Sequence, residues 1–302
     1  MLSVEIHMAL QIGDTGPAVK DLQQYLDSLR FALAQDGVFG PRTDDAVRGF
    51  QLVCGLVVDG IVGPITQGAI DTGAWESVRD NATVRLRLRR IRRTDTTTIP
   101  PTSTDLEIDV KWPRIDEGHF FDATTANANL EREVESLISD FASNAGLAAS
   151  GAGPSRIEGE IEATLIAPSL VSLHGNLSVY HSGAAHPNPQ VFVRTIDLAA
   201  DSYISPADFW MPSTDYPSVL RGIASFTYDP NLPGLAPTAF NYKHQALTPS
   251  GVRVVFDPYQ VAPGAAGAPH VLAQWAKIEA YIRPSIIARA AFGDPGGPGP
   301  HP

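Results

Sequence analysis

One short phrase occurs twice near the start of the chain, and it decides how that part folds. Residues 36–43 read DGVFGPRT, and residues 59–66 read DGIVGPIT. In each copy Asp-Gly favours a tight turn, and the Pro after the second Gly favours the first position of a helix. The repeat therefore predicts two turns, each followed by a helix that begins at Pro41 or at Pro64.

Apolar spacing around the two phrases predicts a compact unit of three short helices. Gly16-Pro17 marks the start of the first helix, and Gly55 marks the end of the second. Apolar residues three or four apart give each helix one buried face. They are Val19, Leu22, Leu26 and Leu29, then Ala46, Val47 and Phe50, then Ile65, Ala69 and Ile70. We place this unit at residues 9–75.

Residues 80–292 carry the patterns of a larger α+β domain. Period-two alternation predicts strands at 83–93 and 106–110, and strand-like runs follow at 157–167, 171–181, 191–198 and 251–256. One helix is predicted over 127–142, and a last helix is predicted to carry Val271, Trp275, Ile278 and Ile282, with a break at Pro284. The fold class predicted is α+β, a three-helix module plus a mainly antiparallel sheet packed by helices. The Gly- and Pro-rich residues 293–302 are expected to be disordered.

The charge and hydropathy of the chain argue against several classes of protein. Lys and Arg number 22 against 33 Asp and Glu, a net charge of −11, so we expect no nucleic-acid partner. No apolar run reaches the roughly 18 residues that a membrane helix needs. Residues 1–9 have neither a basic start nor an apolar core, so no signal peptide is visible.

The single cysteine, Cys54, allows no disulfide within the chain. It lies on the predicted second helix, and we interpret it as a small buried apolar residue. A wall enzyme with a cysteine nucleophile is therefore not expected.

The first unit resembles the peptidoglycan-binding repeat domain (PG_binding_1) of bacterial cell-wall proteins. The matching elements lie between residues 10 and 69 and include GDTG at 13–16, both repeated phrases, FQ at 50–51 and GL at 55–56. The resemblance implies a module that binds peptidoglycan in a shallow groove through polar groups. The candidates for that contact are Asp36, Arg42, Gln51 and Asp59. The repeated glycines and apolar residues are interpreted as structural.

Three histidines lie close together in the sequence, His174, His181 and His186. Zinc needs three or four ligands at a fixed geometry, whereas His174 and His181, seven apart on a strand, point to opposite faces. The stretch also lacks the Gly, Ala and Asp of the wall zinc-peptidase pattern that Ser172 and His174 begin. We expect no metal and no cofactor, and we interpret these histidines as structural or surface residues.

The same stretch resembles a second family, the DUF4163/DUF3298-like domain of lysozyme-sensing anti-sigma factors and peptidoglycan deacetylases. The motifs that carry the resemblance are WPRI at 112–115, SGAAHP at 182–187, SPADF at 205–209, LTPSGV at 247–252 and VFDPYQVAP at 255–263. It implies a binding or sensing domain without catalytic residues of its own. His186 and Tyr259 are hallmark residues of the domain. They fit a packing or turn role, and they are also the candidates for ligand contact.

Together these features predict a non-catalytic cell-wall protein that binds peptidoglycan through its first unit and a protein or glycan through its second. One alternative is a peptidoglycan hydrolase or other wall-modifying enzyme. Glu133, Glu135, Glu160 and Glu162 supply carboxylates for it, but no spacing selects a pair. The other alternative is a sensor or inhibitor that binds lysozyme or another wall-associated protein. Both resemblances imply an extracytoplasmic or cell-wall location.

An arginine-rich strand leaves two interpretations open. Six arginines lie within residues 85–93 and alternate with apolar residues at the start of the run. They fit a solvated edge strand, in which like charges discourage pairing with other strands. They also fit attraction to anionic wall polymers or to an acidic partner.

Overall fold

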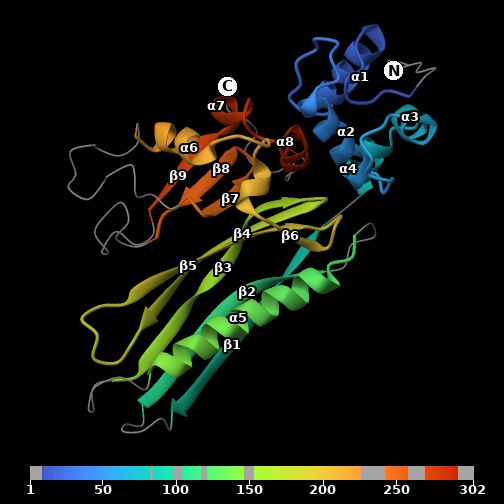
Figure 1. Ribbon diagram of the computed structural model, residues 1–302. Coiled ribbons are helices and arrows are strands. Elements are labelled where there is room, and N and C mark those ends of the chain that lie inside the picture. The colour runs from blue at the N-terminus through green and yellow to red at the C-terminus, as the bar shows by residue number, and fades with distance from the viewer. Residues whose placement is uncertain are drawn as a thin grey trace.

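The chain forms a helical N-terminal module followed by a longer domain built on two β-sheets (Figure 1). The structure is a computed structural model that describes residues 9–81, 84–97, 104–116, 121–145, 153–225, 242–257 and 269–291. The predicted α+β class is confirmed. None of the helices within these ranges combines the length and the apolar character needed to cross a bilayer.

The helices of the N-terminal module are α1 (Pro17–Ser28), α2 (Pro41–Val53), α3 (Pro64–Asp71) and α4 (Ala74–Asn81). The first three begin where the sequence predicts, each with a Gly N-cap and a Pro in the first turn. The fourth was not predicted. It buries Trp75 against Phe31 and Phe50, with ring centroids 4.9 and 6.0 Å apart, and this aromatic packing is a tertiary contact that no local pattern indicates.

The core of the module contains the apolar faces predicted for α1 and α2, including Val19, Leu22 and Phe50. The prediction for α3 is half right, because Ile70 is buried whereas Ile65 is 76% exposed. Ala288 also belongs to this core, although it lies on α8 (Pro284–Ala290) near the other end of the chain. The C-terminal helix therefore contributes to the packing of the N-terminal module.

The longer domain is organised by a six-stranded sheet in the order of the chain, β1 to β6. The strands are β1 (Arg85–Thr97), β2 (Thr104–Asp116), β3 (Ser155–Ala167), β4 (Leu170–Tyr180), β5 (Asn188–Asp197) and β6 (Ser202–Ile204). All neighbours are antiparallel except β2 and β3, which are parallel. A parallel pair needs a crossover, and helix α5 (Thr124–Ala145) provides it and lies along the sheet (Figure 1).

The face of this sheet that meets α5 forms the largest core of the protein. Leu130, Val134 and Phe141 of α5 pack against Val110 of β2 and Leu173 of β4. The predicted helix stripe is thus confirmed, and the helix is longer than predicted at both ends. The opposite face of the sheet remains for other elements to cover.

A second, three-stranded antiparallel sheet consists of β7 (His244–Thr248), β8 (Gly251–Val255) and β9 (His270–Gln274). It packs with the short helices η1 (Pro206–Phe209), α6 (Tyr216–Ser225), α7 (Trp275–Ile278) and α8 in a separate core. Gly251 begins β8 with φ 153°, and a Cβ there would lie 2.1 Å from the carbonyl oxygen of Ala273. Only glycine permits this close approach of β8 to β9.

The prediction of one last helix from Val271 to Ile282 is wrong. Val271 lies on β9, where it pairs with Val254 of β8. Trp275 and Ile278 lie on α7, and Ile282 forms a β-bridge with Trp210. Pro284 starts α8 instead of breaking a helix, because proline fits the first helical turn. Pairing with β8 outweighs the local helical spacing of residues 271–282.

Candidate functional site

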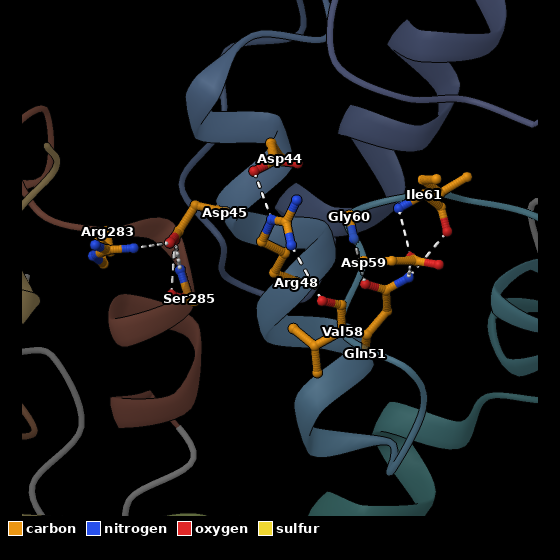
Figure 2. A network of polar contacts seen from close by, with 10 residues as sticks. All are labelled: Asp44, Asp45, Arg48, Gln51, Val58, Asp59, Gly60, Ile61, Arg283 and Ser285. Carbon is orange, nitrogen blue, oxygen red and sulfur yellow. Dashed lines mark hydrogen bonds and ion pairs between the residues drawn. The ribbon is translucent and has the colours of Figure 1, made fainter. Parts of the chain in front are cut away.

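The second repeated phrase folds around a buried glutamine of α2. Figure 2 shows Gln51 reaching from the helix to the turn. Its Nε2 donates to Asp59 Oδ1 (2.8 Å), to the carbonyl of Ile61 (3.0 Å) and to Thr66 Oγ1 (3.1 Å). Its Oε1 accepts from the backbone N–H of Gly60 (2.9 Å). Gln51 is 1% exposed, and these four bonds use both ends of its amide.

The first phrase repeats the same arrangement with Gln23 of α1. Its Nε2 donates to Asp36 Oδ1 (2.9 Å), to the carbonyl of Val38 (3.0 Å) and to Thr43 Oγ1 (3.1 Å). Its Oε1 accepts from the backbone N–H of Gly37 (2.8 Å). The module therefore contains two equivalent helix–turn units, each held by one glutamine.

The carboxylates of Asp36 and Asp59 lie exposed at the two turns. The backbone N–H two residues further on lowers the pKa of each carboxyl group, and the amide of Gln23 or Gln51 lowers it further. Oδ1 of each carboxylate accepts these turn bonds. Two ionised groups are thus presented in matching positions on the two units.

Arg42 follows the first turn and faces the C-terminal domain. Its guanidinium donates to the carbonyls of Ala280 (3.2 Å), Ile282 (3.0 Å) and Ala32 (2.9 Å). Burial lowers the pKa of Arg42. The matching position in the second phrase is Ile65, which is exposed. The equivalence of the two units therefore ends at this position, where the first unit meets the rest of the chain.

Asp45 and Gly49 extend this contact along α2 to α8. Asp45 accepts hydrogen bonds from Arg283 Nη1 (3.0 Å), from the backbone N–H of Ser285 (3.0 Å) and from Ser285 Oγ (2.7 Å), as Figure 2 shows. A Cβ on Gly49 would lie 2.4 Å from Cβ of Ser285. The two helices are close because position 49 has no side chain.

The other side of α2 faces the second turn. Arg48 Nε donates to Asp44 Oδ2 (2.8 Å), and its Nη1 donates to the carbonyl of Val58 (3.1 Å; Figure 2). Helix α2 therefore connects the second turn, through Arg48 and Gln51, with α8, through Asp45.

Of the two residues predicted to contact a ligand in the second domain, the structure describes one. His186 is exposed after β4, and its Nδ1 lies 3.0 Å from the carbonyl oxygen of Pro187. Tyr259 lies outside the described residues. Their part in ligand contact stays a prediction.

The three neighbouring histidines of the sequence are separated in the fold. His181 stacks on Phe141 of α5, with ring centroids 5.6 Å apart, whereas His174 lies on the other face of the sheet near His244 and His270 of the second sheet. Their predicted divergence is therefore correct. Over the described ranges, no three His, Cys, Asp or Glu side chains are placed to hold a metal ion.

Other candidate chemical groups have structural partners. Glu133 pairs with Arg194 at 2.8 Å, and Glu160 pairs with Lys111 at 2.9 Å. Burial raises the pKa of the Cys54 thiol to about 12, and the charge of Glu76 adds to the effect. Because thiolate is the nucleophilic form, this raised pKa argues against Cys54, which is half-buried, as a nucleophile at neutral pH.

The arginine-rich strand is β1, which lies at the edge of the six-stranded sheet. Arg87 pairs with Asp116 at 2.9 Å, and Arg90 pairs with Asp109 at 2.6 Å. These pairs join β1 to β2 on the solvent side. Exposed pairs of this kind contribute little to stability, and both interpretations of the strand stay open.

Comparison with known proteins finds a family model that matches the N-terminal module and another that matches part of the longer domain. Residues 15–70 match the family model "Putative peptidoglycan binding domain" (PG_binding_1), and residues 220–276 match "Protein of unknown function (DUF3298)". The chain carries a PG_binding_1 domain and a DUF3298 domain. Both resemblances inferred from the sequence are thus confirmed, and they support a role associated with the cell wall.

The individual relatives either match this chain over a single domain or have low sequence identity to it. An "Uncharacterized protein in bpoA1 3'region" of Kitasatospora aureofaciens is 48% identical over 60 residues, which is 19% of this chain and 51% of that protein. The chain therefore spans about half the length of that curated relative. A DUF3298 family protein from Pseudomonas aeruginosa has a TM-score of 0.48 at 15% identity, over 67% of this chain and 97% of that one. A DUF3298 member from Bacteroides fragilis has a TM-score of 0.47 at 15% identity, over 70% and 99%.

The sequence predicted Gln51 as a site residue but not its equivalent Gln23, nor the role of both amides in holding the turns. Gln23 and Gln51 each precede one copy of the phrase and each occupy a helix, so a buried amide for each turn was open to inference. Asp45 carried no comparable signal, because its partner Ser285 lies 240 residues away in the sequence.

Proposed function

We propose that this protein binds peptidoglycan through its N-terminal module and does not modify it. The observation that carries the proposal is the PG_binding_1 match over residues 15–70, which covers both glutamine-braced turns. The −11 charge argues against a nucleic-acid role. The same match motivates the proposal that the protein works outside the membrane, at the wall.

Within this proposal the four predicted contact residues take different parts. Asp36 and Asp59 contact the polymer, because both are exposed and their low pKa values keep them ionised. They accept hydrogen bonds from the hydroxyl and amide N–H groups of the glycan and its peptides. Gln51 acts through Asp59, which it holds in place. Arg42 orients the first turn through its carbonyl contacts.

Co-sedimentation of the full chain with purified sacculi tests this proposal. D36N/D59N keeps the shape of both side chains but removes both charges, so we expect about tenfold weaker binding or more. D21N removes a charge from an exposed position on α1 and should bind as the wild type does. Equal pelleting of D36N/D59N and D21N would contradict the assignment of these contacts.

The non-catalytic part of the proposal needs its own assay. Sacculi incubated with the full chain should release no soluble muropeptides above the buffer background. A time-dependent release that scales with protein concentration would show that the protein is a wall-modifying enzyme.

For the second domain we propose that it binds a protein or glycan ligand through His186 and Tyr259. The DUF3298 match, residues 220–276, supports the domain assignment and covers Tyr259. Lysozyme is the first protein to test, by calorimetric titration of the full chain and of H186A and Y259A. Micromolar binding that both variants weaken is the expected result, and equal binding by the variants would refute these contacts.

A further inference from the structure

Four groups that can carry positive charge converge where the second sheet packs on the first. In the register of the second sheet, His244 of β7 and His270 of β9 both lie opposite Val255 of β8. Residues directly opposite one another share a face of a sheet, and so do residues two apart on a strand. Arg253 of β8 therefore lies on the same face as both histidines.

A small apolar cluster places His174 against this face. Val193 of β5 packs with Ala246 and Val255 of the second sheet, and His174 of β4 lies opposite Val193. The face of the first sheet that carries His174 thus meets the face of the second that carries Arg253 and His270.

Hydrogen bonds fix this junction. The backbone N–H of Leu247 donates to Ser172 Oγ at 2.9 Å, and Thr164 Oγ1 donates to the carbonyl of Leu247 at 2.8 Å. Ser172 lies two residues before His174 on the same face of β4. The junction beside the four groups is therefore fixed by hydrogen bonds, while His174, His244 and Arg253 are half-buried and His270 is exposed at its margin.

His174 has an unmet hydrogen-bonding requirement at this junction. Its Nε2 is buried and has no hydrogen-bond partner. Burial, and after it the charges of Arg253, His270 and His244, together lower the pKa of His174 to about 4. Buried polar atoms in proteins are nearly always paired, and the nearby guanidinium of Arg253 favours an anion as the partner.

The acidic groups nearby do not pair with Nε2 of His174, so a ligand can do so. Asp257 Oδ1 lies 2.9 Å from His244 Nε2, and Asp257 Oδ2 lies 3.2 Å from Lys243 Nζ. Glu162 lies opposite His174 in the register of β3 and β4, yet its carboxylate makes no hydrogen bond to His174 Nε2. Asp257 thus orients His244, while Nε2 of His174 has no partner among the described residues.

We propose that His174, Arg253 and His270 hold an oxyanion, the phosphate or carboxylate group of a ligand of the second domain, with His244 as a positioning residue. A guanidinium binds either group through two parallel hydrogen bonds, and Nε2–H of His174 supplies a further donor. This site is separate from the N-terminal module, so it does not depend on peptidoglycan binding.

Nuclear magnetic resonance of the histidine side chains in the full chain tests the site directly. Inorganic phosphate and acetate are titrated separately, with chloride holding the ionic strength constant. A saturable shift of the His174 resonances and a rise of its pKa toward the ordinary value of about 6.5 are expected with at least one anion. A response to phosphate and not to acetate indicates a phosphate ester as the natural group. A response to acetate and not to phosphate indicates a carboxylate.

Matched variants separate a built site from general charge effects. R253Q should weaken the anion response at least tenfold, whereas R85Q, an exposed arginine on the far edge of the first sheet, should leave it unchanged. H174Q should abolish binding measured by calorimetry. If H174Q does not fold by circular dichroism, the wild-type titration and R253Q decide the question. A response equal to that of chloride, or an equal response in R253Q and wild type, would overturn the proposal.

Discussion

Replacing Gln23 with methionine tests how strongly the buried amide stabilises the first turn. Gln23 is 2% exposed and makes four hydrogen bonds, one of them to the carboxylate of Asp36. Methionine has a similar length and volume but cannot replace these bonds. It would also leave the backbone N–H of Gly37 without its acceptor.

The expected loss follows from these bonds. A neutral hydrogen bond contributes about 0.5–1.5 kcal/mol, a bond to a charged group contributes about 1.5–3 kcal/mol, and an unpaired buried group adds a penalty. Because the neighbouring bonds relax partly, we expect Q23M to lower the free energy of unfolding by about 3–5 kcal/mol.

Urea unfolding followed by tryptophan fluorescence measures this loss. Trp75 lies in the same core and reports on the module. Q24M is the control, because Gln24 is the next residue on α1 and is exposed. If Q23M and Q24M agree within about 0.5 kcal/mol, the buried amide does not stabilise the turn and the reasoning is refuted.

The same turn predicts an acid dependence. The backbone N–H of Val38 and the amide of Gln23 lower the pKa of Asp36 in the folded chain. Its contribution to stability is therefore complete above the unfolded value of about 3.9 and is lost as the pH falls through the lower folded value. D36N cannot titrate, so its stability should fall less than that of the wild type over this range. Parallel melting profiles between about pH 2 and pH 6 would contradict the prediction.

Three further perturbations test other contacts. G49A places a Cβ 2.4 Å from that of Ser285, so thermal melts should show a loss of about 1–3 kcal/mol, and a melt equal to that of the wild type would contradict the close contact of α2 and α8. R289M leaves the carboxylate of Asp197 buried without the guanidinium that now lies 2.5 Å from it, so the loss should be about 3–5 kcal/mol; a loss below about 1 kcal/mol would show that the pair is replaceable. Cys54, whose pKa burial raises to about 12, should be alkylated much faster after denaturation, and equal rates would contradict its burial.

Sequence reasoning succeeded where the signals are local. Gly and Pro of each repeated phrase mark the starts of α2 and α3 correctly, because N-terminal turn chemistry depends on neighbouring residues alone. The stripe around Leu130 predicts α5 for the same reason, since one periodic face meets one sheet.

It failed where distant segments decide the structure. Val271 has helical neighbours in sequence but pairs with β8, and Ile65 lies in a helix yet faces solvent. The convergence of His174 with Arg253 depends on how the two sheets pack, and residue spacing along one strand does not predict that packing. For Val271, strand pairing outweighs local helical propensity; in the other two cases the arrangement of distant segments decides.

The position of α8 has a consequence for biosynthesis. Asp45 and its partner Ser285 are 240 residues apart, and ribosomes add about 5–20 residues per second. The helix that covers α2 is thus synthesised about 10–50 seconds after α2 itself. During that interval the surface around Gly49 is uncovered in the nascent chain, so a chaperone or another nascent chain has time to bind it before the protein's own C-terminal helix arrives.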